Sequence, residues 1–150
     1  MLNFVYPQSA MVTAVTAIQV PYLTGIMRLF SSPIVFTPLL NQAELVAIEA
    51  TFTGYAEITY TTLPAPFPDQ TNGGVSFMIP TSTFVVGATP TVTNEIFGGW
   101  LETAAHALLM AWQTTNPWPM QTAGQALPVE ILLNNFGNGL VQVQYQGIPQ

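Results

Sequence analysis

The sequence contains no cysteine and no lysine, and its only arginine and only histidine are Arg28 and His106. Without cysteine, the chain forms no disulfide, no thiolate zinc site and no cysteine nucleophile. Nucleic-acid binding requires lysine and arginine to neutralise phosphates, and one arginine against seven acidic residues does not supply that charge. Electrostatic binding to an anionic membrane fails for the same reason. We therefore expect neither nucleic acid nor a membrane among the partners of this protein.

Charged residues make up 5% of the chain, against roughly 25% in an ordinary soluble protein, whereas 49% of the residues are hydrophobic. The surface must then be covered by threonine, glutamine, asparagine and apolar groups. Such a surface provides little repulsion between molecules, and large exposed apolar patches usually mark contact sites. We therefore expect obligate assembly, in which much of the exterior is buried against other chains.

The first twenty or so residues are apolar but carry no basic residue, so we expect no signal peptide. No apolar run reaches the roughly 18 residues of a membrane-spanning helix without a proline or polar interruption. We expect the protein to be made and assembled inside a cell. A chain of 150 residues predicts a single domain, residues 1–150, with one substantial core.

Short β-branched or alternating segments, separated by glycine, proline and asparagine, predict about eight strands. Outside the central segment described below, we expect strands at residues 25–30, 55–63, 75–79, 83–86, 127–136 and 140–146. Residues 1–24 are predicted to form an N-terminal arm with a short helix over residues 9–19. Residues 42–50 suit one or two helical turns or an irregular edge. The predicted fold is mainly β: an antiparallel β-sandwich or barrel over residues 25–150, with at most one or two short helices.

Prolines and glycines predict the connections between these strands. Residues 31–41 and 114–124 are expected to be loops. The prolines of residues 64–68 predict an extended segment without sheet pairing. Residues 72–74 and 137–139 are expected to make tight turns, the second of them within a C-terminal hairpin.

The central segment, residues 91–113, holds two of the three tryptophans, the only histidine and the longest apolar run. The even-numbered residues from Val92 to Trp100 would all lie on one face of a β-strand. We therefore expect this stretch to form a strand. Residues 103–112 can then return as a second strand. They can equally form a short helix, because Trp100, Ala104 and Leu108 share a helical face and alanine and leucine favour helices.

Each candidate catalytic or metal site has an ordinary alternative. His106 has no second histidine or cysteine beside it, so we interpret it as a hydrogen-bonded or turn residue. The chain has no Gly-x-Ser-x-Gly elbow and no glycine-rich phosphate loop. Residues 69–73 offer oxygen ligands for calcium but read better as a plain turn. Any two of the six glutamates could form a glycosidase pair, but the spacing of these residues is ordinary. The six are Glu44, Glu49, Glu57, Glu95, Glu102 and Glu130. We expect no enzyme activity, no cofactor and no metal.

The aromatic residues have two interpretations. They could line a sugar-binding face, but tryptophan and tyrosine serve equally well in a core or an interface, which we favour. They are Tyr55, Tyr60, Trp100, Trp112, Trp118 and Tyr145. Trp118, which lies between two prolines, is expected on a loop. Together with Tyr6 on the N-terminal arm and Met120, it forms the predicted interface.

Four short motifs occur in an order typical of one group of proteins. A strand with a basic residue, residues 26–30, precedes an acidic segment that enters a Phe-Thr-Gly-Tyr-Ala bend, residues 49–56. A Thr-Asn-x-Ile-Phe-Gly strand follows at residues 93–98, and an Ala-Leu-x-Val strand at residues 126–129. In these motifs, which extend over the larger part of the chain, the protein resembles a group of small tailed-phage proteins encoded among virion structural genes. It departs from that group in its extra C-terminal hairpin and its scarcity of charge.

The resemblance implies a structural role without catalytic residues, and it favours a tight turn at residues 102–106 over the helix. We therefore expect a non-enzymatic structural protein of a phage virion, either a capsid decoration or cement subunit or a tail or neck subunit. It would be a homo-oligomer, would bind other virion proteins such as a capsid or tail protein, and would be located in the virion after assembly in the host cytoplasm. The alternative is a lectin-like or receptor-binding module that recognises a surface glycan.

Overall fold

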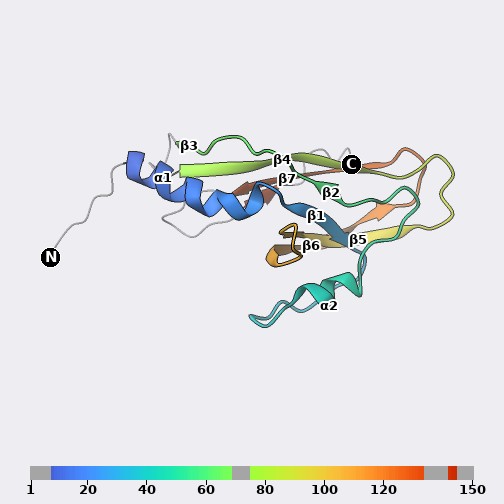
Figure 1. Ribbon diagram of the computed structural model, residues 1–150. Helices are drawn as coiled ribbons and strands as arrows, with labels where there is room; N and C mark the ends of the chain where they lie inside the picture. The colour runs from blue at the N-terminus through green and yellow to red at the C-terminus, as the bar shows by residue number, and fades with distance from the viewer. Residues whose placement is uncertain (1–7, 69–74, 134–141, 145–150) are drawn as a thin grey trace.

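The computed structural model describes residues 8–68, 75–133 and 142–144. These residues form two 4-stranded antiparallel sheets that pack as an open sandwich (Figure 1), which confirms the predicted fold class and selects the sandwich over the barrel. The first sheet has the strand order β2-β1-β5-β6 and the second the order β3-β4-β7-β8. The strands are β1 (Ile26–Phe30), β2 (Ile58–Thr59), β3 (Phe67–Pro68), β4 (Val75–Val85), β5 (Asn94–Glu102), β6 (Leu108–Met120), β7 (Ala126–Leu133) and β8 (Gln142–Gln144).

Two short α-helices accompany the sheets. Helix α1 spans Gln8–Gln19, which confirms the predicted N-terminal helix, and a 3₁₀ turn, Val20–Tyr22, ends it. Helix α2 spans Gln42–Val46 and begins at a capping box, in which Asn41 and Glu44 each accept a hydrogen bond from the other's backbone N–H. No helix among the described residues is long and apolar enough to cross a membrane.

The main core lies between the two sheets. Strand β7 shows why: every second residue, from Leu127 to Leu133, is buried, as a strand with one face on a core requires. The fully buried side chains of this core include Met27, Leu29, Phe77, Ile79, Ile96, Leu101, Met120, Val129 and Ile131.

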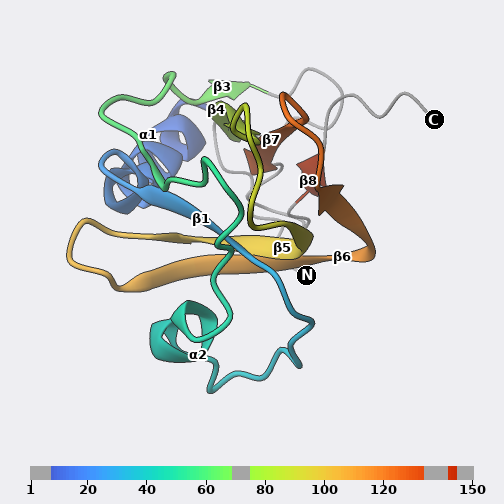
Figure 2. The same cartoon turned by 90° about the vertical axis from the view of Figure 1, so that its right-hand side faces the viewer.

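A second, smaller core lies on the opposite face of the first sheet, where residues 31–49 cover it. It consists of Phe30, Leu45 and Trp100, and Figure 2 shows α2 on the side of β1, β5 and β6 that faces away from β4 and β7. The β5–β6 register shifts between Ile96 and Gly98. Ile96 therefore faces the main core while Trp100 faces the small core, so the predicted single parity of residues 92–100 is wrong beyond Ile96.

Strands β5 and β6 form a hairpin. The predicted second strand is therefore confirmed, and the alternative prediction of a helix over residues 103–112 is wrong. The turn is closed by a hydrogen bond of 2.9 Å from the Thr103 N–H to the Ala107 carbonyl oxygen. His106 has φ 63°, in the left-handed region that L residues seldom occupy outside turns.

The strand predicted at residues 55–63 is only two residues long in the structure. Beyond Met27, the edge of β1 that β2 would use is taken by residues 48–50. The Ala50 N–H donates to the Leu29 carbonyl oxygen at 2.9 Å, and Phe30 forms an isolated bridge with Glu49. Residues 55–57 would lie opposite this part of β1, so they have no strand left to pair with on that side. Residues 60–63 extend past Ile26, where β1 begins.

Three further expectations change. Strand β4 runs through Pro80, with a register irregularity between Ile79 and Ser82, in place of two separate strands. Phe67–Pro68 pairs with β4, so the proline segment does contribute to a sheet. Residues 114–120 belong to β6, so the loop predicted at residues 114–124 is confined to the segment after Met120. The turns predicted at residues 72–74 and 137–139 lie outside the described residues, although the described parts of β7 and β8 pair antiparallel, as the predicted C-terminal hairpin requires.

Candidate functional site

Arg28 is surrounded by three carboxylates. Its Nη1 lies 3.0 Å from Glu49 Oε1, its Nη2 forms an ion pair with Glu57, and its Nε lies 3.0 Å from Glu102 Oε1. The Nε contact is an ion pair without hydrogen-bond geometry. The Glu102 side chain has no exposed surface and that of Arg28 is 16% exposed, so this pair is largely shielded from water, whereas the Glu57 side chain is exposed.

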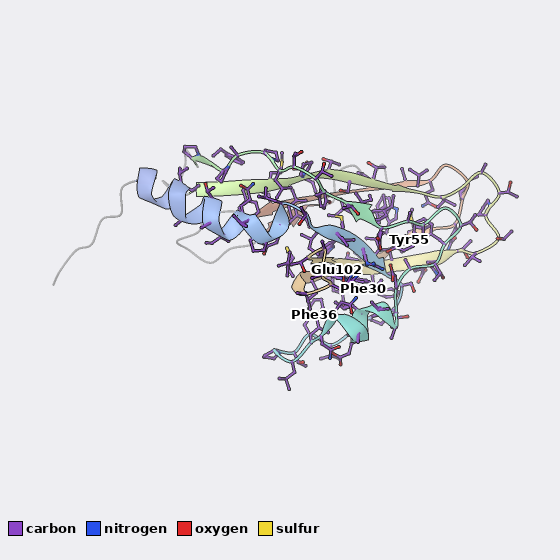
Figure 3. All side chains as sticks on the ribbon, viewed as in Figure 1. Phe30, Phe36, Tyr55 and Glu102 are labelled. Atoms are coloured by element: carbon purple, nitrogen blue, oxygen red, sulfur yellow. The ribbon has the colours of Figure 1, made fainter. Side chains whose placement is uncertain are left out.

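Sheet register explains why these residues meet. Arg28 on β1 lies directly opposite Trp100 on β5, and Glu102 follows two residues later on the same face. Glu49 is held beside β1 by its bridge to Phe30. Figure 3 shows Glu102, Phe30 and Tyr55 gathered around β1.

Hydrogen bonds extend the cluster on both sides. Trp100 Nε1 donates to Glu102 Oε2 at 2.9 Å, and His106 Nδ1 bonds to Glu102 Oε1 at 2.8 Å. The Tyr55 hydroxyl donates to Glu49 Oε1 at 2.9 Å and accepts from the Leu29 N–H at 3.1 Å. Burial raises the pKa of Tyr55, so its hydroxyl stays protonated and serves as a donor.

The pKa of Glu102 is set by opposing effects. Burial raises it, but hydrogen bonds from Trp100, His106 and Gln42, together with the charge of Arg28, outweigh burial. The net result is a pKa below the ordinary value of 4.5. Glu102 is therefore an ionised carboxylate at neutral pH, held by its partners.

The described geometry makes this cluster a structural clamp. Three of the six glutamates considered for a catalytic pair, Glu49, Glu57 and Glu102, are bound to Arg28. His106 is bound to Glu102, as its interpretation as a hydrogen-bonded turn residue anticipates. Among the described residues, no group of three or more His, Cys, Asp or Glu is placed to hold a metal ion; the calcium candidate at residues 69–73 lies outside them. The cluster ties the bend at residues 49–57 and the turn at residues 103–107 to β1.

Acid should weaken this clamp. The pKa of Glu102 is lower in the folded chain than in the unfolded one, so its contribution to the free energy of unfolding is complete above pH 4.5. That contribution is lost as the pH falls through the folded pKa. Urea unfolding at neutral pH and below pH 4.5 should show a smaller acid-induced loss for Glu102→Gln than for the unaltered chain. Equal losses in the two proteins would contradict the assignment.

The predicted interface residues do not form one surface in the described chain. Trp118 lies in β6 opposite Ile96, half-buried against the main core, so its placement on a loop is wrong. Met120 is 0% exposed and packs inside the main core, so it is no interface residue of this fold. The two residues share a strand face, and that face turns inward. Tyr6 lies outside the described residues.

Among the described residues, the two most exposed large apolar side chains lie elsewhere, on residues 33–40, which we call the apolar arm. Val35 and Leu39 are 81% and 86% exposed and Phe36 is 45% exposed; Figure 3 shows Phe36 on the far side of the first sheet from β4 and β7. The sequence predicted a loop for this segment but did not lead us to expect an exposed apolar surface there. The feature that could have indicated one is the apolar run between Pro33 and Pro38.

Comparison of the chain with protein-family models, with curated proteins and with solved structures finds no match in any of the three.

Proposed function

We propose that this chain is a non-enzymatic structural protein of a phage virion that assembles with copies of itself, as a capsid decoration or cement subunit or as a tail or neck subunit. The observation that carries the proposal is the apolar arm. Val35 and Leu39 stay largely in water in the single chain. Burying a side chain of this kind contributes about 1.5–3 kcal/mol, so assembly gives the arm a stabilising role that the single chain does not provide.

The charge distribution supports the same proposal. Arg28 is the only lysine or arginine of the sequence, and three carboxylates of its own chain bind it. No lysine or arginine is left to attract the phosphates of a nucleic acid or a membrane. Proteins are the partners that suit such a surface: further copies of this chain and a capsid or tail protein.

The assignment to phage rests on the sequence resemblance. Two of the resembling motifs carry the charge cluster, since one contains Arg28 and another contains Glu49 and Tyr55. The bend within the second motif turns at Gly54, whose φ of 90° would strain any L residue in its place. The motifs therefore coincide with residues that this fold needs. The proposed location is the virion, reached by assembly in the host cytoplasm.

Self-assembly should depend on the apolar arm. Light scattering at micromolar concentration should show a stable oligomer for the unaltered chain, whereas the double variant Val35→Ser/Leu39→Ser should shift to smaller species. The melting temperature of this variant should fall only by the amount that loss of the oligomer accounts for. The fold of the single chain should be unaffected, because both side chains are exposed in it. The matched control is Val85→Ser/Val92→Ser, which alters two exposed valines elsewhere. A stable monomer of the unaltered chain would overturn the assembly proposal.

The virion location has a separate test. Mass spectrometry of density-gradient-purified phage particles should detect the chain in a fixed ratio to the major capsid or tail protein. Recovery of the chain only in the soluble fraction of the lysate would overturn the proposed virion location but would leave the self-assembly proposal unaffected.

The lectin-like alternative gains no specific support. Sugar binding by stacking needs open aromatic faces, but Tyr60, Trp100 and Trp112 are buried, and Trp118 packs half-buried against the main core.

A further inference from the structure

Strand β6 forms an edge of the first sheet. Within the described residues it has a strand neighbour, β5, on one side only. Its first half, residues 108–113, contains no proline and no charged residue, and we call this segment the free edge. The register irregularity with β5 affects its first two residues, and Met110–Gln113 pair regularly. A free edge of this length spans about 20 Å.

An unpaired strand edge exposes backbone N–H and C=O groups that can pair with another strand, and many proteins block such edges with lysine or proline. This chain has no lysine, and the first proline of β6 is Pro117. The second half of β6 is therefore protected, whereas the free edge is not. The residues of the free edge from Leu108 to Ala111 are only half-buried.

The free edge and the apolar arm form one continuous surface. Leu108 and Ala111 from β6, and Ile34 and Leu40 from the arm, pack around the same small core. The Ile34 N–H also donates to Gln113 Oε1 at 3.0 Å, which joins the two segments directly. The partly buried apolar residues that pack on the small core are Ile34, Leu40, Ile48, Phe97, Leu108 and Ala111.

We propose that the free edge pairs antiparallel with the free edge of a second copy of this chain about a two-fold axis, which extends the first sheet across the dimer. The proposal rests on the self-assembly proposed above and names its surface. An antiparallel edge is self-complementary under a two-fold rotation. Apolar side chains on the small core flank the free edge, and residues 108–113 themselves carry no charge, so two copies bury apolar surface there without placing like charges of the edge opposite each other.

Cysteine scanning tests this pairing, since the chain has no cysteine of its own. Single variants Leu108→Cys, Leu109→Cys, Met110→Cys, Ala111→Cys and Gln113→Cys should be oxidised as the native oligomer. Opposite residues in antiparallel strands lie about 4.5–5.5 Å apart, within disulfide reach. One position or two neighbouring positions near the axis should therefore form a dimer in high yield. Val85→Cys, exposed on β4, is the control and should give only background.

The outcomes separate the two proposals. An oligomer in which every edge variant cross-links no more than Val85→Cys overturns the edge pairing and leaves self-assembly standing. A monomer by light scattering overturns both.

A charge on the free edge gives a second, independent measurement. Leu109→Lys should abolish the dimer, because a lysine on an edge opposes pairing, while Val85→Lys adds the same charge on β4 and should leave the dimer intact. Far-UV circular dichroism checks that each variant is folded. A folded Leu109→Lys protein that dimerises like Val85→Lys would overturn the proposal. Added salt should tighten the native dimer, because two copies with a net charge of −6 repel each other.

Discussion

Gly98→Ala is expected to destabilise the protein by about 3 kcal/mol, the largest effect we predict for a change this small. A Cβ at this position would collide with the Trp112 carbonyl oxygen and would lie 2.5 Å from Phe30 Cζ and 2.9 Å from Gln113 Cα. Two of these atoms are backbone atoms of β6, so relief requires β5 and β6 to separate. Equilibrium urea unfolding measures the effect.

The matched control is Gly87→Ala. The nearest atom to a Cβ there is a methyl carbon of Thr53 at 3.3 Å, which can give way, so the cost should be less than about 1 kcal/mol. Similar losses for the two alanine variants would contradict the close packing of β5 on β6 at Gly98.

The packing explains why two glycines stand together in a central strand. Gly98 lies opposite Phe30 on β1, and Gly99 lies opposite Trp112 on β6. A Cβ on Gly99 would lie 2.6 Å from the Trp112 ring. Each glycine thus leaves room for an aromatic ring to cover the strand, which compensates for the weakness of glycine in a sheet. These rings belong to different cores, so the glycine pair lets the central strand support both.

Arg28→Met should reduce the free energy of unfolding by about 3–5 kcal/mol, the range for removing one partner of a buried ion pair. The methionine keeps most of the aliphatic stem but leaves Glu49, Glu57 and Glu102 without their cation. Glu102 suffers most, since it has no exposed surface and would be a buried charge without a counter-ion. Urea unfolding at neutral pH gives the magnitude.

The control is a double-mutant cycle with Glu102→Gln. If the pair is coupled as the geometry requires, Arg28→Met/Glu102→Gln should be more stable than the sum of the two single losses implies. Additive losses, or an Arg28→Met variant within about 1 kcal/mol of the unaltered chain, would show that the cluster is not the clamp described above.

Much of the secondary structure followed from local sequence. The alternation in residues 127–133 predicted β7, and the helical spacing in residues 9–19 predicted α1, because side-chain periodicity depends on the element alone. Composition alone likewise excludes a basic binding surface, because a chain with one arginine and no lysine cannot form one.

The charge cluster could not be predicted in the same way. Arg28, the bend that holds Glu49 and Glu57, and Glu102 lie far apart in the sequence, and their convergence depends on which strands pair and in which register. His106 was correctly interpreted as a hydrogen-bonded turn residue, but its partner Glu102 became evident only once the hairpin placed both at one end of β5 and β6.

The sequence by itself determined that this protein is mainly β with few charges, because strand periodicity, turn residues and composition are local properties; only the structure decided for a sandwich over a barrel. The tertiary structure decided the rest. The register shift between Ile96 and Gly98 divides one strand between two cores, and the pairing of residues 48–50 with β1 shortens β2. The strand order leaves β6 with one strand neighbour within the described residues. All three depend on contacts between distant segments, which no local pattern specifies.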